Sequence, residues 1–130
     1  MRRTPILVLT VALLVPLFTV ACGTGNLTIP EGLSPAELIQ KAQEASDRNR
    51  HGEALQYYRA LLERNGDVPE LVVNAEYEIA FIHYKRRNFA EARAGMRALL
   101  ERYDASDGGE LPEKFRILAE IVLARMEDTE

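Results

Sequence analysis

Apolar residues recur at helical spacing along most of this chain. From position 34 onward they return every three or four residues in five stretches, at about 34–48, 52–64, 67–86, 88–103 and 112–126. This is the spacing of one buried face of an α-helix, whereas a half-buried strand would alternate at every second residue. The pattern predicts an all-α protein of about five antiparallel helices, with no strand.

Local signals mark where these helices begin and end. Residues 34–37 read Ser-Pro-Ala-Glu, which predicts a capping box with proline in the first turn. Residues 67–70 and 88–91 repeat the pattern of a short polar residue followed three positions later by glutamate, and so predict two further side-chain caps. The Asn-Gly pair at 65–66 predicts the end of the second helix, because both residues tolerate a positive φ.

The predicted third helix is apolar on two sides. Tyr77, Phe81 and Tyr84 share one face at spacings of four and three residues. The opposite face carries Val72, Ala75, Ile79 and Ile82. Such a helix is expected at the centre of a bundle. The aromatic face either packs against the first and fifth helices or lines a groove for a partner. Core packing is favoured for Phe81, while the two tyrosines are the better groove candidates, because their hydroxyls suit a half-wet surface.

Small residues repeat along the chain with a nearly constant period. Ala42 and Ala80 are 38 residues apart, as are Ala54 and Ala92, and Ala119 follows Ala80 by 39. Self-similarity at such a period predicts stacked helical hairpins. Alanine at these positions lets two helices joined by a short turn approach closely.

On these residues the chain resembles the tetratricopeptide repeat family over about 34–126. Ile79-Ala80 stands at the family's Leu-Gly pair, Tyr84 at an aromatic position, and Ala92 and Leu99 at packing positions of the second helix. The earlier copy is weaker, and the third has its first helix only. The resemblance implies a concave groove that holds a peptide or a partner helix. By repeat position this groove would contain Tyr77, Phe81 and Tyr84 together with Ile39, Gln43, Lys85, Arg116 and Glu120.

The first 21 residues have the form of an export signal. Arg2 and Arg3 precede a nearly continuous apolar run at 6–21, and a basic start followed by an apolar core is typical of a secretory signal. A permanent membrane anchor is the less favoured alternative, because the run is shorter than the roughly 20 residues that span a bilayer and contains Pro16.

Cys22 is the only cysteine, so it cannot form a disulfide within the chain. Residues 19–22 resemble the lipobox of bacterial lipoproteins, with Ala21 at its small position and Thr19 in place of the usual leucine. The resemblance implies a lipid on Cys22, and Gly23 in place of aspartate implies the outer membrane, with the domain facing the periplasm. The alternative is an ordinary signal peptide. Residues 23–32 are rich in glycine, proline and small polar residues, which predicts a tether with no packed structure.

The domains expected are therefore a signal peptide at 1–21, a lipidated cysteine and tether at 22–33, and a helical domain at 34–127. The whole chain carries a net charge of −4, and without Arg2 and Arg3 the charge is near −6. An acidic balance argues against a nucleic-acid-binding protein. Neither of the two histidines stands at a metal-ligand spacing, and no nucleophile and base are paired. We expect no metal, no cofactor and no enzymatic activity.

The run Lys85-Arg86-Arg87 closes the third helix. Cations there are favourable against the helix macrodipole, and this interpretation is preferred over contact with an acidic partner or with lipid head groups. The sequence thus favours a lipid-anchored protein-binding module, a scaffold or accessory subunit of an envelope assembly or secretion complex. The alternatives are a structural lipoprotein that self-associates through the open ends of its short array, and an accessory subunit of an envelope enzyme.

Overall fold

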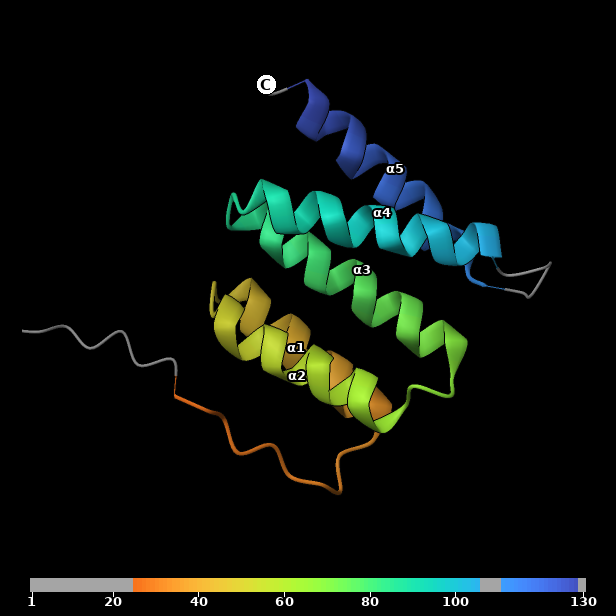
Figure 1. Ribbon diagram of the computed structural model, residues 1–130. Helices are drawn as coiled ribbons and strands as arrows, with labels where there is room; N and C mark the ends of the chain where they lie inside the picture. The colour runs from red at the N-terminus through yellow and green to blue at the C-terminus, as the bar shows by residue number, and fades with distance from the viewer. Residues whose placement is uncertain (1–24, 106–110, 129–130) are drawn as a thin grey trace, which may run out of the picture.

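The computed structural model describes residues 25–105 and 111–128. It contains α1 (Pro35–Asp47), α2 (His51–Arg64), α3 (Pro69–Lys85), α4 (Phe89–Ala105) and α5 (Glu113–Glu127) (Figure 1). No strand occurs in these two ranges, which confirms the all-α array of five helices. None of the described helices is long and apolar enough to cross a membrane.

The helix starts confirm one predicted cap and correct another. At α1 the backbone N–H of Glu37 donates to Ser34 Oγ at 3.3 Å, and Ser34 N–H donates to Glu37 Oε2 at 2.8 Å. At α3 the prediction of an Asp67 cap was wrong, because the N-cap is Val68 and no side chain caps this end. Pro69 in the first turn already has a helical φ and no N–H to satisfy.

The two hairpin turns have the same backbone structure, 38 residues apart. Asn49 ends the first helix of one hairpin with φ 58°, and Arg87 ends that of the other with φ 62°. Arg50 N–H donates to the carbonyl of residue 45 at 2.8 Å, and Asn88 N–H donates to the carbonyl of residue 83 at 2.9 Å. Both turns therefore close with one residue in the left-handed conformation and with the same reach-back hydrogen bond. The sequence period thus corresponds to a repeated structural unit.

Small residues bring paired helices together. A Cβ built on Gly95 of α4 would lie 2.8 Å from the Cβ of Ala80 on α3, closer than such atoms approach. The alanines of the repeat are all buried, namely Ala42, Ala54, Ala80, Ala92 and Ala119. Their burial confirms the role expected from their spacing.

The core forms two clusters that share α3. Ala75 and Ile82 on one face of α3 join α1 and α2, and Tyr77 and Ala80 on the other face join α4 and α5. The two-sided pattern of this helix is therefore confirmed. On α5, helical spacing alone would place Leu118 with the buried Phe115, Ala119 and Val122, but its side chain is 38% exposed.

Residues 25–33, here called the strap, lie along α2, so the expected tether without packed structure is corrected. Leu27, Ile29 and Leu33 pack against the first core cluster. Leu27 N–H donates to Gln56 Oε1 at 2.7 Å, and Arg64 Nη1 donates to the carbonyl of Pro30 at 2.9 Å. The strap follows α2 because its three apolar side chains are partly buried there. Side chains of α2 also form hydrogen bonds with the backbone of the strap.

Candidate functional site

Five aromatic rings form a continuous row on the side of α3 that faces α5. Ring centroids lie 5.7 Å apart for Phe115 and Tyr77, 5.7 Å for Tyr77 and Phe81, 5.8 Å for Phe81 and Tyr84, and 6.0 Å for Tyr84 and Phe89. These are the separations of interacting aromatic pairs. The row, called here the aromatic row, links α5, α3 and the start of α4.

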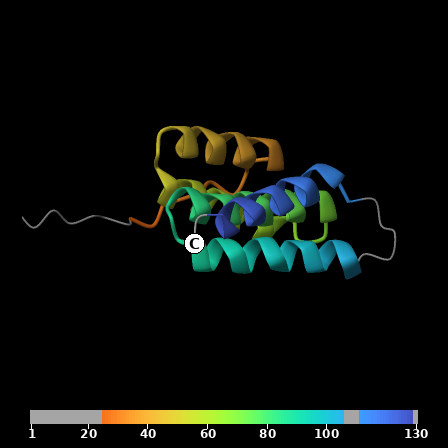
Figure 2. The ribbon, with the colours of Figure 1, turned by 90° about the horizontal axis from the view of Figure 1, so that it is seen from above.

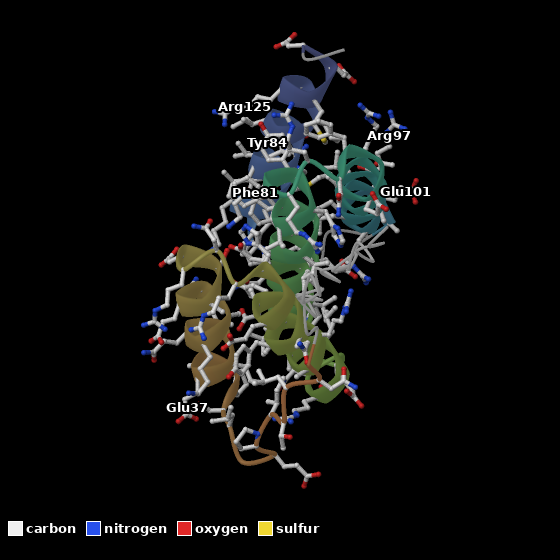
Figure 3. All side chains as sticks on the ribbon, turned by 90° about the vertical axis from the view of Figure 1, so that its left-hand side faces the viewer. Glu37, Phe81, Tyr84, Arg97, Glu101 and Arg125 are labelled. Atoms are coloured by element: carbon white, nitrogen blue, oxygen red, sulfur yellow. The ribbon has the colours of Figure 1, made fainter. Side chains whose placement is uncertain are left out.

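Burial divides the aromatic row into core and surface parts. Tyr77 and Phe115 are only 6% and 5% exposed, so they belong to the core. Burial raises the pKa of the Tyr77 hydroxyl to about 12. Phe81 and Tyr84 are half-buried, and they lie on the opposite side of the molecule from Arg97 (Figure 3). Of the two tyrosines predicted as groove residues, only Tyr84 is thus accessible to a partner. Phe81, which was expected to belong to the core, is accessible as well.

Lys85 lies against this exposed part. Its Nζ is 5.3 Å from the centroid of the Phe81 ring, within range of a cation–π interaction. The same Nζ donates a hydrogen bond to Ser46 Oγ on α1. Lys85 therefore connects the two hairpins at the edge of the aromatic row.

Glu78 is a charged group of this region that the sequence did not single out. It is half-buried on α3, and its pKa is raised by burial, with Lys85 and Lys114 acting in the opposite direction. Glu76, two residues earlier, instead accepts a hydrogen bond from Arg102 Nε on α4 at 2.8 Å. The two carboxylates point to different sides, as their spacing predicts. Helical spacing alone could not show how deeply Glu78 is buried.

The remaining predicted groove residues are less closely joined to the aromatic row. Arg116 is bound to its own helix, where it pairs with Glu113 and, at 3.4 Å, with Glu120. Gln43 is exposed, and its side chain makes no hydrogen bond within the part of the chain described. Cys22 lies outside the described residues. The structure brings Phe81, Tyr84 and Lys85 together, whereas Gln43 and Arg116 share no hydrogen bond, ion pair or ring contact with them among the described residues.

A cleft lies between α2, α3 and α4. This cleft of about 280 Å³ is lined by Leu62, Glu76, Ile79, Ala80, His83, Glu91, Gly95 and Ala98. Its small residues are those that let α3 and α4 approach. Nδ1 of His83 is buried there without a hydrogen-bond partner in the described residues. Over those same residues, no three His, Cys, Asp or Glu side chains gather as metal ligands.

Comparison with known proteins gives one relative. An uncharacterized protein of Treponema pallidum (strain Nichols) is 32% identical over 117 residues, which cover 88% of this chain. The match covers 47% of the Treponema protein, so this chain spans about half the length of its relative. No protein family model matches the sequence, and no solved structure matches it.

Proposed function

We propose that this protein is a lipid-anchored helical-hairpin module of the bacterial envelope that binds a protein or peptide partner over Phe81 and Tyr84. The observation that carries the proposal is the aromatic row, which is anchored in the core at Tyr77 and Phe115 and emerges half-buried at the next two rings. Rigid aromatic side chains bind at low entropic cost, because little freedom remains to be lost.

The charges around the exposed rings indicate the chemistry of the partner. Lys85 and Lys114 each lie over a ring of the aromatic row, at 5.3 Å and 4.6 Å from its centroid. Glu78 is half-buried, and both lysines act electrostatically on its carboxylate. A segment that presents an apolar side chain to Phe81 and Tyr84, with an acidic group toward the lysines, would fit this surface best.

The envelope placement rests on the chain start and on the repeat. The export signal at 1–21, the lipobox-like residues before Cys22 and the resemblance to tetratricopeptide repeats are sequence features. The repetition of one turn geometry at a spacing of 38 residues supports a hairpin-repeat architecture. A role as scaffold or accessory subunit of an envelope assembly or secretion complex follows by analogy with that family.

Site-specific photo-crosslinking in cells tests the binding surface. A benzophenone amino acid at Tyr84 should give an adduct of defined mass, and the same group at Arg97, on the opposite side, should not (Figure 3). Phe81→Ser should abolish the Tyr84 adduct. Adducts of the same mass from both positions, or one that survives Phe81→Ser, would contradict the proposal. Membrane fractionation of Cys22→Ser tests the anchor separately, because an unlipidated chain should leave the membrane fraction.

Self-association is a second candidate, which the outer face of α5 favours. Ile117, Leu118 and Ile121 are 47%, 38% and 42% exposed, although the end of a repeat array usually carries a polar face. A second copy could cover this face by antiparallel pairing of two α5 helices. Size-exclusion chromatography of wild type and of Ile117→Ser with Ile121→Ser tests it. A wild-type dimer that the variant converts to monomer supports self-association, and a monomeric wild type rules it out.

A further inference from the structure

The strap fixes where the chain leaves the domain. Arg64, near the end of α2, holds the carbonyls of Ile29 and Pro30 at 3.2 and 2.9 Å, while Gln56, near the start of α2, holds Leu27. The strap therefore runs along α2 toward its first turn. The start of the strap, drawn in orange, thus lies at the end of the molecule where both hairpin turns lie (Figures 1 and 2).

The two hairpin turns lie side by side at this end. Lys85, at the end of α3, donates its hydrogen bond to Ser46, at the end of α1. His51, which begins α2, has its pKa lowered by burial and further by the charges of Lys85 and Arg86. Residues 48–50 and 85–87 thus form one surface, here called the turn end.

The turn end is basic in an acidic protein. Its cations are Arg48, Arg50, Lys85, Arg86 and Arg87, all exposed. Glu44 and Glu53 pair with Arg48 and Arg50 at 3.8 and 2.9 Å. Asp47 and Glu91 are also acidic and stand next to the two turns in the chain, and Lys85 acts electrostatically on Glu78. Arg86 and Arg87 form no ion pair with a described residue, so the unpaired positive charge of this end lies on them. The carbonyl end of α3 offsets only about half of one charge.

The opposite end of the molecule is acidic. It carries eight acidic residues, against the basic Arg64, Arg102, Lys114 and Arg116, and the acids are Glu31, Glu37, Glu63, Asp67, Glu70, Glu101, Asp104 and Glu113. The chain as a whole bears −4, so an anionic surface would repel the molecule in most orientations. It would attract the molecule only when the turn end faces it.

From the strap and the turn end together we propose that the turn end is a docking surface for anionic lipid head groups. The exit point and the basic surface coincide, so the N-terminal attachment and the charge hold the domain in the same orientation. This inference rests on the membrane anchor of the proposed function. It leaves Phe81 and Tyr84, on the side of the array, free for a partner.

Docking of the strap on α2 shortens the free chain between Cys22 and the domain, and this keeps the turn end near the membrane surface. Five residues separate Cys22 from Leu27, and an extended chain spans at most about 17 Å over that distance. If the strap hung free as far as Leu33, the eleven residues would span about 37 Å. Electrostatic attraction to a membrane decays over about one Debye length, near 8 Å at physiological salt. A docked strap keeps the turn end close to this range.

Hydrogen exchange on vesicles tests the inference. The full chain, isolated with its N-terminal modification, is reconstituted into phosphatidylcholine vesicles with or without about 30 per cent phosphatidylglycerol. With the anionic lipid, amides at 48–53 and 86–91 should become protected and those at 65–70, at the opposite end, should not. The protection should disappear at 1 M salt, where the Debye length is about 3 Å.

Charge variants show which residues make the contact. Arg86→Gln with Arg87→Asn keeps a residue that tolerates the positive φ at position 87. Two basic residues strengthen binding to an anionic surface by roughly 25-fold. In this variant the amides of the turn end should therefore exchange as fast on anionic vesicles as on neutral ones. Arg59→Gln with Arg97→Gln removes the same charge from exposed mid-helix positions and should remain protected.

The outcomes separate this inference from the proposed function. The docking surface would be ruled out if the amides of the turn end exchanged at the same rate on neutral and anionic vesicles, or at the same rate in both double variants. The membrane anchor would be unaffected by that result. Failure of the chain to remain on vesicles at all would overturn the anchor and the docking surface together. Protection caused by an added acidic protein on neutral vesicles, without a lipid effect, would reassign the turn end to a protein partner and so also overturn it. Binding of a partner at Tyr84 is read out by crosslinking and is independent of these results.

Discussion

Gly95 sets how closely α3 and α4 can approach. An added Cβ would lie 2.8 Å from the Cβ of Ala80, whose backbone belongs to the central helix and cannot easily move. Gly52, in the first turn of α2, has no atom within 4 Å of an added Cβ. The same substitution should therefore have opposite effects at the two glycines.

We predict that Gly95→Ala lowers the free energy of unfolding by about 1 kcal/mol. Overpacking costs about 1–3 kcal/mol, which outweighs a gain of about 0.5–1 kcal/mol from replacing a helical glycine. Gly52→Ala, the matched control, should raise it by up to about 1 kcal/mol. Chemical denaturation of both variants measures the difference. If Gly95→Ala and Gly52→Ala raised the stability equally, α3 and α4 would be able to move apart without an energetic cost.

Glu78 carries an electrostatic penalty that depends on pH. Burial raises its pKa above the ordinary glutamate value of 4.5, and Lys85 and Lys114 offset only part of that effect. The folded state therefore holds the proton more tightly than the unfolded state. The penalty is absent well below pH 4.5, where both states are protonated, and is complete once the pH exceeds the raised pKa.

We therefore predict that Glu78→Gln is more stable than wild type at pH 7 and no more stable at pH 3. The glutamine keeps the shape of the side chain and cannot ionise. Thermal unfolding followed by circular dichroism at both pH values measures the effect. An unchanged difference between the two proteins from pH 7 to pH 3 would mean that ionisation of Glu78 does not limit stability.

The repeated turn contains a different residue in each hairpin. The left-handed position is Asn49 in the first hairpin and Arg87 in the second. Asparagine visits this region readily, whereas most residues with a Cβ are destabilised there by about 1–2 kcal/mol. If the basic turn end has a function, the arginine is retained at a cost in stability.

We predict that Arg87→Gly raises the free energy of unfolding by about 0.5–1 kcal/mol, while Asn49→Gly changes it little. The gain is reduced by loss of the contact between Arg87 and the Phe89 ring, whose centroid is 6.0 Å away. Denaturation midpoints of the two variants, compared under identical conditions, give the answer. A larger gain at Asn49 than at Arg87 would contradict this account of the turn.

Over the whole molecule, α3 makes two core clusters into one cooperative unit. One cluster joins α1 and α2, the other joins α4 and α5, and each includes residues of α3. Loss of either cluster should therefore expose one face of α3 and weaken the other cluster. The strap adds to the first cluster through Leu27, Ile29 and Leu33.

We predict that Leu38→Ala, at a fully buried position of α1, lowers the free energy of unfolding by about 2–5 kcal/mol. Hydrogen exchange under mild denaturant should show α5 and α2 opening together in the variant. Lys41→Ala, on the exposed side of α1, serves as the control and should stay within about 0.5 kcal/mol of wild type. Persistent protection of α5 after α2 has opened would show that the clusters unfold independently.

The sequence by itself determined the helices, their order and which helical faces are apolar. Periodicity, the Ser34 capping box and the spacing of the small residues are local properties, so Ala42, Ala80 and Ala119 could be placed in the core without coordinates. The same local reasoning identified α3 as a helix with two apolar faces and put Phe81 and Tyr84 on one of them, while the resemblance to tetratricopeptide repeats added Lys85 to that region.

Only the tertiary structure decided which of these residues meet a neighbour and which remain exposed. Helical spacing places Tyr77 and Tyr84 on one face, but the position of Phe115 on α5 buries the first and leaves the second half-exposed. The strap, the burial of Glu78 and the basic turn end likewise depend on contacts between segments far apart in the chain. The pattern along one helix shows which residues share a face, but it does not show how far away the next helix lies. The distances between segments decide which side chains are exposed, where charges gather and how far the domain lies from its N-terminal attachment.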